Sequence, residues 1–175
     1  IQQYIDGMAA QWEATWRELD LTFSDFIRTT QPRHLTAVRE FFRRVEAKGD
    51  IYEGEYVGLY CTGCEAFYRT SDLNEAGECP LHRRKPEMIR EKNYFFRLTK
   101  YRDALLAYIE AHPEFIQPTS RRNEIINYIT NHLEDVSISR QSQKWEIPVP
   151  GDESQVLYVW FDAPIGYISA TKEWA

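Results

Sequence analysis

Cysteine is scarce in this sequence, and its scarcity limits what the chain can be. Three of the 175 residues are cysteines, and an odd number does not suit a framework of disulfides. No charged and then apolar leader opens the chain, so we expect no secretory signal and a reducing, cytoplasmic setting. In that setting, clustered cysteines are typical of metal sites or redox groups. Because the first residue is Ile1, we also expect an excerpt from a longer protein.

The sequence also lacks a long apolar run and an excess of positive charge. No run approaches the ~20 apolar residues that a membrane helix needs, so no membrane partner is expected. The formal net charge is -6 at pH 7, whereas dedicated nucleic-acid-binding domains are usually basic. Basic clusters at 43–44, 83–85 and 121–122 are interpreted as solvated surface, with local RNA contact left open.

Periodicity predicts an alternation of helices and strands. Apolar residues recur at helical spacing in four segments, 2–19, 32–48, 100–111 and 121–131. Short β-branched and aromatic runs predict strands at 23–29, 94–96, 136–138 and 156–161, the last of them buried on both faces. Between these elements, residues 51–98 hold all the cysteines and many glycines and prolines, so they need a metal or a similar crosslink to fold. The pattern predicts an α/β fold in which a small metal-binding domain interrupts an open sheet.

The cysteines share their spacing with a histidine. Cys61 and Cys64 form a C-x-x-C pair, and fourteen residues later Cys79 and His82 form C-x-x-H. Two-residue spacers let each turn direct two ligands at one centre, and three thiolates with one imidazole make a closed tetrahedral shell for one structural zinc ion. The alternatives are unrelated thiols or a redox pair, but a redox C-x-x-C belongs at a helix start after a strand. The other histidines are isolated and are interpreted as surface or capping residues: His34, His112 and His132.

A family resemblance rests on sequence landmarks along most of the chain. The run VLYVWFDAPIGYIS at 156–169 closely resembles the segment by which methionyl-tRNA synthetases re-enter their catalytic domain. Other landmarks follow in the family's order: DFIRTT at 25–30 with PRH at 32–34, GDIYEGEY at 49–56, GLYC at 58–61, NYFFRL at 93–98, RRNE at 121–124, VSISR at 136–140 and IPVPG at 147–151. One landmark would be weak evidence, but the ordered set with the metal ligands inside it is specific.

The resemblance implies a class I synthetase that activates methionine with ATP and Mg²⁺ and transfers it to tRNA(Met). Its catalytic domain is a Rossmann-type parallel sheet, split by a zinc-knuckle connective domain. The implied divisions are 1–50, the end of the first catalytic half; 51–98, the connective domain; 99–135, a helical return segment; and 136–175, the start of the second half. The family's two ATP motifs and its anticodon-binding domain are absent, so the segment alone is expected to be inactive.

The resemblance also assigns roles to single residues. Four residues match positions that line the family's methionine pocket: Trp160, Ala163, Pro164 and Tyr167. Arg140 matches a position near the activation site, where a guanidinium stabilises charge on the ATP phosphates or the substrate carboxylate. From the residues alone, Trp160 and Tyr167 would be core aromatics, Arg140 would form a surface salt bridge, and Asp162 would cap a helix.

Two other classes of protein remain as alternatives. A free-standing zinc-ribbon module could recruit RNA or protein, but it would have no use for a buried strand at 156–161. A different class I synthetase would carry a long editing insert, and the insert here is short.

Overall fold

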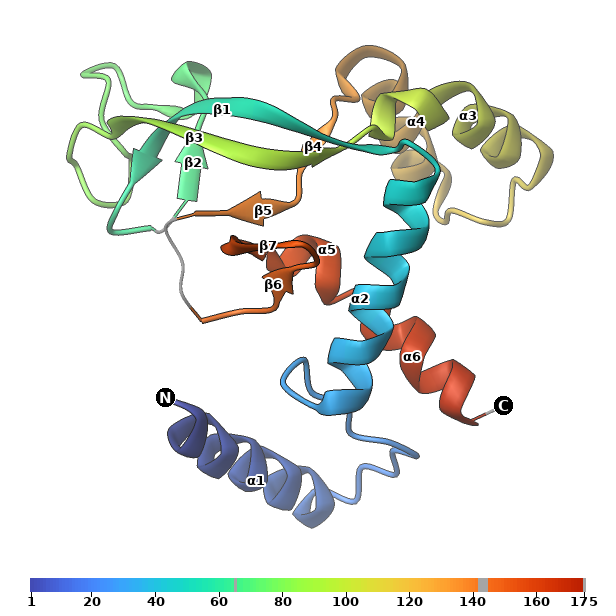
Figure 1. The fold of residues 1–175 in the computed structure, drawn as a ribbon. Coiled ribbons are helices and arrows are strands. Elements are labelled where there is room, and N and C mark those ends of the chain that lie inside the picture. Colours follow the sequence, from blue (N-terminus) through green and yellow to red (C-terminus); the bar gives the residue numbers. More distant parts are fainter. Residues whose placement is uncertain (65, 142–144, 175) are drawn as a thin grey trace.

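The computed structural model describes residues 1–64, 66–141 and 145–174, which form a mixed assembly of helices and strands (Figure 1). The helices are α1 (Gln2–Glu18), α2 (Pro32–Ala47), α3 (Arg102–Ala111), α4 (Thr119–His132), α5 (Val159–Asp162) and α6 (Ile165–Trp174). The strands are β1 (Ile51–Cys61), β2 (Ala66–Tyr68), β3 (Glu87–Phe96), β4 (Val136–Ser137), β5 (Ser139–Arg140), β6 (Pro148–Val149) and β7 (Asp152–Leu157). Among the described residues, no helix combines the length and apolarity needed to cross a membrane.

The strands form two sheets, both of them antiparallel. The larger sheet has the order β2-β1-β3-β4, and its centre is a long ribbon in which β1 pairs with β3 from Ile51 opposite Phe96 to Tyr60 opposite Glu87. The smaller sheet has the order β5-β7-β6. Every strand pair in the described ranges is antiparallel, so the parallel, Rossmann-type sheet expected from the resemblance is not formed within them.

The two segments expected to supply catalytic-domain strands explain this difference. Residues 23–29 form no strand; Phe23 and Phe26 instead pack edge-on against Trp16. The apolar run at 156–161 is divided, because β7 ends at Leu157 and α5 begins at Val159. Within the described chain no parallel neighbour lies beside β7, and its backbone pairs with the nearby β5 and β6.

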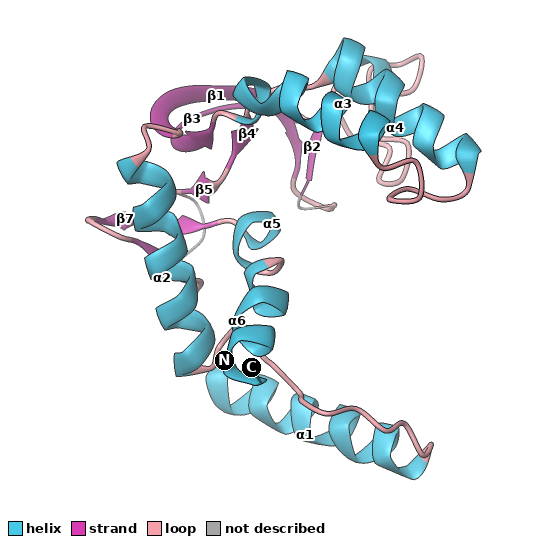
Figure 2. Cartoon of the chain, turned by 90° about the vertical axis from the view of Figure 1, so that its right-hand side faces the viewer, coloured by secondary structure: helices cyan, strands magenta, loops and turns pink. Residues whose placement is uncertain are grey.

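A single hydrophobic core joins α2, α6 and the smaller sheet. Its buried members are Val38, Phe42, Ile138, Ile147, Val149, Leu157 and Ile165. Pro32 starts α2 at a position where its missing N–H costs nothing, and Gly49, with φ +71°, lies just beyond the end of that helix. A smaller cluster of Ile109, Ile129 and Leu133 joins α3 to α4. Helix α2, which contributes Val38 and Phe42 to the larger core, runs from the larger sheet to that core (Figure 2).

Helix α1 forms as predicted, but its apolar face does not enter the core. None of its residues is buried, and Trp12 is 55% exposed. Figures 1 and 2 both place α1 apart from the two sheets. An ion pair from Asp6 to Arg28, 2.6 Å long, connects the helix to the segment that follows it.

Candidate functional site

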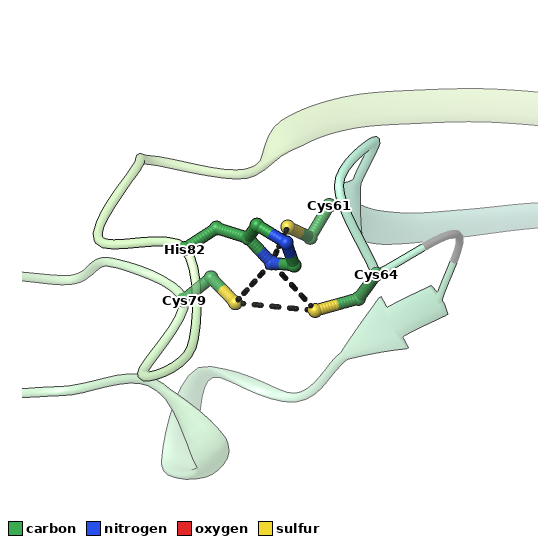
Figure 3. A group of neighbouring side chains, drawn as sticks. All are labelled: Cys61, Cys64, Cys79 and His82. Atoms are coloured by element: carbon green, nitrogen blue, oxygen red, sulfur yellow. Dashed lines mark hydrogen bonds between the residues drawn. The ribbon is translucent and has the colours of Figure 1, made fainter.

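The four predicted metal ligands lie together at one end of the larger sheet. Cys61 is the last residue of β1, Cys64 closes the tight turn after it, and Cys79 and His82 come from the loop before β3. Figure 3 shows the four side chains pointing toward one another. Their ligand atoms all lie within 4.8 Å of one another. We call these four residues the zinc knuckle.

The spacing of the donor atoms fits a tetrahedral zinc ion. Zinc bonds of ~2.3 Å to sulfur and ~2.0–2.1 Å to nitrogen hold neighbouring ligand atoms about 3.5–3.8 Å apart. The Sγ atoms of Cys64 and Cys79 are 3.5 Å apart, and Nδ1 of His82 is 3.9 Å from the Sγ atoms of Cys61 and Cys79. Its contact with Cys64 is shorter, at 3.0 Å. A Cβ at Gly63 would lie 2.6 Å from the His82 ring, so the turn requires glycine there.

Hydrogen bonds favour the thiolate form of Cys79, which is the form that binds metal. Burial alone raises the pKa of the Cys79 thiol, but hydrogen bonds from His82, Tyr68 and the Leu81 backbone lower that pKa to about 5. The Tyr68 hydroxyl also donates to Cys64 Sγ at 3.1 Å. The pKa of Cys64 is raised instead: the Tyr68 hydroxyl lowers it, but burial and the neighbouring Cys79 and Cys61 thiols outweigh that effect. Hydrogen-bond donors next to metal ligands orient the ligands and stabilise their charge. The Tyr68 hydroxyl therefore suits a site made of thiolates.

Arg140 lies on β5, and neutral groups hold its guanidinium. Its Nη1 donates to the Ser137 hydroxyl and to the Ser139 carbonyl, both at 2.7 Å, and the guanidinium lies 4.1 Å from the centre of the Tyr158 ring. Among the described residues, no carboxylate oxygen lies within 4.0 Å of it. Within the described residues, the surface salt bridge considered from sequence is not formed, and neutral groups hold the guanidinium.

A buried polar network supports the backbone around Arg140. Ser139 is fully buried; its hydroxyl donates to Gln155 Oε1 at 2.6 Å and accepts from the Tyr94 N–H at 2.7 Å. The buried Asn93 amide donates to the Ser137 hydroxyl at 3.1 Å. These hydrogen bonds connect β5 to β3 and β7, although the buried Oδ1 of Asn93 has no hydrogen-bond partner among the described residues.

The proposed pocket residues lie on or next to α5 and α6, and their aromatic rings face solvent. Trp160 is 75% exposed and Tyr167 82% exposed. Pro164 is exposed as well, and Ala163 is partly buried. The interpretation of the two aromatics as core residues, drawn from the residues alone, is therefore wrong. Trp160 lies on α5 and Tyr167 on α6, and we refer to these four residues together as the pocket face.

One buried polar pair was missed by the sequence analysis. His34 is completely buried, and its Nε2 lies 3.5 Å from Oδ2 of Asp162, which is 6% exposed. The predictions of a surface or capping role for His34 and a capping role for Asp162 are therefore wrong. The spacing of His34, Val38 and Phe42 at every fourth residue of α2 was the signal, since it places the histidine on the buried face.

A cavity of about 330 Å³ lies beside this pair. Its lining includes Leu35, Glu146, Ile147 and Asp162. Burial raises the pKa of Glu146 to about 7, and repulsion from Asp162 adds to this effect, whereas the charge of Arg140 opposes it. The cavity is therefore lined by a carboxyl group whose pKa lies above its ordinary value.

Comparisons with known proteins agree with this arrangement. A family model described as "tRNA synthetases class I (M)" matches residues 1–85 and 71–175. The methionine–tRNA ligase of Thermosynechococcus vestitus is 49% identical over 98% of this chain and 33% of its own length. The chloroplastic/mitochondrial enzyme of Arabidopsis thaliana is 44% identical over 98% of the chain and 28% of its own length.

Solved structures show the same relationship. Methionyl-tRNA synthetase of Mycobacterium tuberculosis bound by methionyl-adenylate matches with a TM-score of 0.80 and 38% identity, over 90% of this chain and 32% of that one. Its apo form matches over the same shares with a TM-score of 0.75. The chain spans about a third of the length of these relatives. The family resemblance is thus confirmed, and the chain belongs to the class I tRNA synthetases of the methionyl type.

Proposed function

We propose that the longer protein containing this chain activates methionine with ATP to methionyl-adenylate and transfers the methionyl group to tRNA(Met). The match of the class I family model across the chain carries this proposal, together with relatives that are named methionine–tRNA ligases. Because the chain spans about a third of those relatives, the activity belongs to the longer protein. ATP with Mg²⁺, methionine and tRNA(Met) are its proposed substrates, and the reducing cytoplasm is its proposed compartment.

The proposed organisation keeps the four divisions 1–50, 51–98, 99–135 and 136–175. In the longer protein, the ends of a Rossmann-type catalytic domain would flank the zinc-bearing segment. The core that joins α2 to α6 and the smaller sheet supports this division, because it connects residues from the first and the last segments.

One zinc ion is proposed as a structural cofactor of residues 51–98. Three thiolates and one imidazole leave no coordination position for water, which is typical of structural rather than catalytic zinc. The ion would supply the crosslink that this segment needs, since its strands bury few apolar side chains. Cys61 and Cys79 are the buried ligands and His82 is the exposed one.

Arg140 and the pocket residues have different proposed roles, one in stabilising charge and the other in binding the methionine side chain. The guanidinium of Arg140, which forms no ion pair within the described residues, would stabilise the negative charge on the ATP phosphates or the methionine carboxylate as the adenylate forms. Trp160 and Tyr167 would contact the methionine thioether, with Ala163 and Pro164 shaping the wall beside them. Contacts between sulfur and aromatic rings contribute roughly 0.3–1.5 kcal/mol each, so an exposed pair of rings suits this substrate.

The pocket assignment predicts that Trp160→Ala in the full-length enzyme weakens methionine use but not ATP use. Loss of the indole would open a void beside the thioether and leave phosphate binding unchanged. We expect the KM for methionine to rise at least about tenfold, equivalent to ~1.4 kcal/mol, with the KM for ATP unchanged. Methionine-dependent pyrophosphate exchange measures both constants, and Tyr167→Ala should show the same selectivity.

Phe115→Ala is the matched control for this experiment. Phe115 is an aromatic residue that is 60% exposed, and it lies between α3 and α4, outside the proposed pocket face. It should leave both constants unchanged. An unaltered methionine KM in a folded Trp160→Ala enzyme would contradict the pocket assignment, and a wild-type enzyme without methionine-dependent exchange would contradict the proposed function.

A further inference from the structure

Two aromatic rings near Arg140 come from the sheet that carries the zinc knuckle. The guanidinium carbon lies 5.6 Å from the centre of the Phe67 ring on β2 and 5.8 Å from that of Tyr56 on β1. The Tyr158 ring is nearer, at 4.1 Å, but it belongs to the segment that immediately follows β7. Cations within about 6 Å of an aromatic ring are attracted by its electron-rich face. The connective segment therefore contacts Arg140 through aromatic rings.

The position of Phe67 is tightly determined. Its ring packs edge-on against Tyr56, with centroids 4.5 Å apart, and lies tilted against Tyr60 at 4.9 Å. A Cβ at Gly58 would lie 2.7 Å from the Phe67 ring, so glycine is needed opposite it. Next to it, Tyr68 donates its hydroxyl hydrogen bond to the metal ligand Cys64. Both the sheet and the zinc knuckle thus fix the strand that presents Phe67.

We propose that Phe67 is a positioning residue for Arg140 and that, with Tyr56, it holds the guanidinium in the orientation used during adenylate formation. This inference rests on the proposed function. Aromatic rings restrict a long, flexible side chain without neutralising it, whereas a carboxylate partner would compete with the substrate's negative groups. The arrangement of Arg140 matches this need: rings and hydrogen-bond acceptors surround it, and no described carboxylate forms an ion pair with it.

The proposal predicts a selective kinetic defect for Phe67→Leu in the full-length enzyme. A lost contact of this type should lower the kcat of methionine activation about 2- to 30-fold. The KM for methionine should stay unchanged, since Phe67 does not belong to the pocket face, and the zinc content should stay at one ion per chain. Phe67→Tyr, which keeps the aromatic face, should restore the rate.

Two further variants separate positioning from a general loss of structure. Phe96→Leu removes another aromatic ring of the same sheet, one that stacks on Tyr101 at 5.7 Å and makes no aromatic contact with Arg140; it should leave kcat unchanged. Phe67→Met retains much of the apolar volume but lacks the ring, so it should lower kcat as Phe67→Leu does. It provides the test if the leucine variant folds poorly. Zinc content and circular dichroism verify folding in each case.

A double-mutant cycle with Arg140→Ala gives the decisive outcome. If Phe67 acts through Arg140, Phe67→Leu should cause no further loss of kcat in the Arg140→Ala background. The same fold-loss in both backgrounds would overturn the positioning role while leaving the role of Arg140 intact. A wild-type kcat in Arg140→Ala alone would instead overturn the proposed role of Arg140, and the positioning role with it.

Discussion

Replacing Arg140 by alanine in the full-length enzyme should lower the kcat of methionine activation by about 10²–10³-fold, as the loss of one preorganised charge-stabilising donor does in other enzymes. Binding of methionine should change little, because the pocket face is intact. Lysine should rescue only partly, since its ammonium cannot present two parallel N–H donors. Pre-steady-state formation of the adenylate measures the rate directly and separates it from the affinity for each substrate.

Arg97→Ala is the matched control for Arg140→Ala. The guanidinium of Arg97 lies 4.2 Å from the Tyr52 ring and donates to the Gly49 carbonyl at 3.2 Å, so it resembles Arg140 in its contacts but has no proposed role in activation. It should leave the adenylate rate near that of the wild type. An unchanged adenylate rate in a folded, zinc-loaded Arg140→Ala enzyme would contradict the assignment.

Replacing Cys64 by serine should abolish stoichiometric zinc binding and unfold the segment around residues 51–98. The physical reason is that the proposed zinc ion would crosslink two loops whose residues bury little apolar surface. Zinc finger peptides gain roughly 10–16 kcal/mol of folding free energy from metal binding at neutral pH. A structural site with the same kind of ligands should gain a comparable free energy. Elemental analysis and amide hydrogen exchange measure the two effects.

Thr62→Ser provides the comparison for Cys64→Ser. Thr62 lies in the same turn, is exposed, and offers no ligand to the cluster. This variant should keep one zinc ion per chain and normal exchange protection. A Cys64→Ser protein with full metal content, or a wild-type protein with far less than one zinc ion, would contradict the zinc site.

The cluster of candidate metal ligands was predictable because its geometry is local. Two-residue spacers determine which side chains can meet, whatever the rest of the fold does, and the structure brings Cys61, Cys64, Cys79 and His82 together. The amphipathic helices were predictable for the same reason: α2 begins at Pro32 and ends before Gly49, as its sequence signals indicated.

The missed features depend on contacts between distant segments. His34 is buried because α2 packs against α5 and α6, and Asp162, which it meets there, is far away in the sequence. The end of β7 at Leu157 depends on its pairing with β5 and β6, whereas the apolar pattern continues to Phe161. Propensity and periodicity do not contain this information, since tertiary packing decides between a strand and a helix in a short apolar run.

The roles of the aromatic residues needed the family resemblance. An isolated sequence gives no reason to place Trp160 and Tyr167 in solvent, where the structure shows both. The exposed rings are the kind of surface that binding sites use, and the matched relatives include a structure bound by methionyl-adenylate. The aromatic contacts to Arg140 could not be predicted either, because Phe67 and Arg140 meet only when the two sheets pack.

Pyrophosphate exchange by the full-length protein, measured across the twenty amino acids, tests the central claim most directly. The account predicts ATP-dependent exchange with methionine, and much weaker exchange with isoleucine, leucine and valine, whose side chains lack the thioether. Exchange driven by another amino acid would indicate a different class I synthetase. A folded, zinc-loaded protein that exchanges pyrophosphate with none of the twenty amino acids would contradict the account.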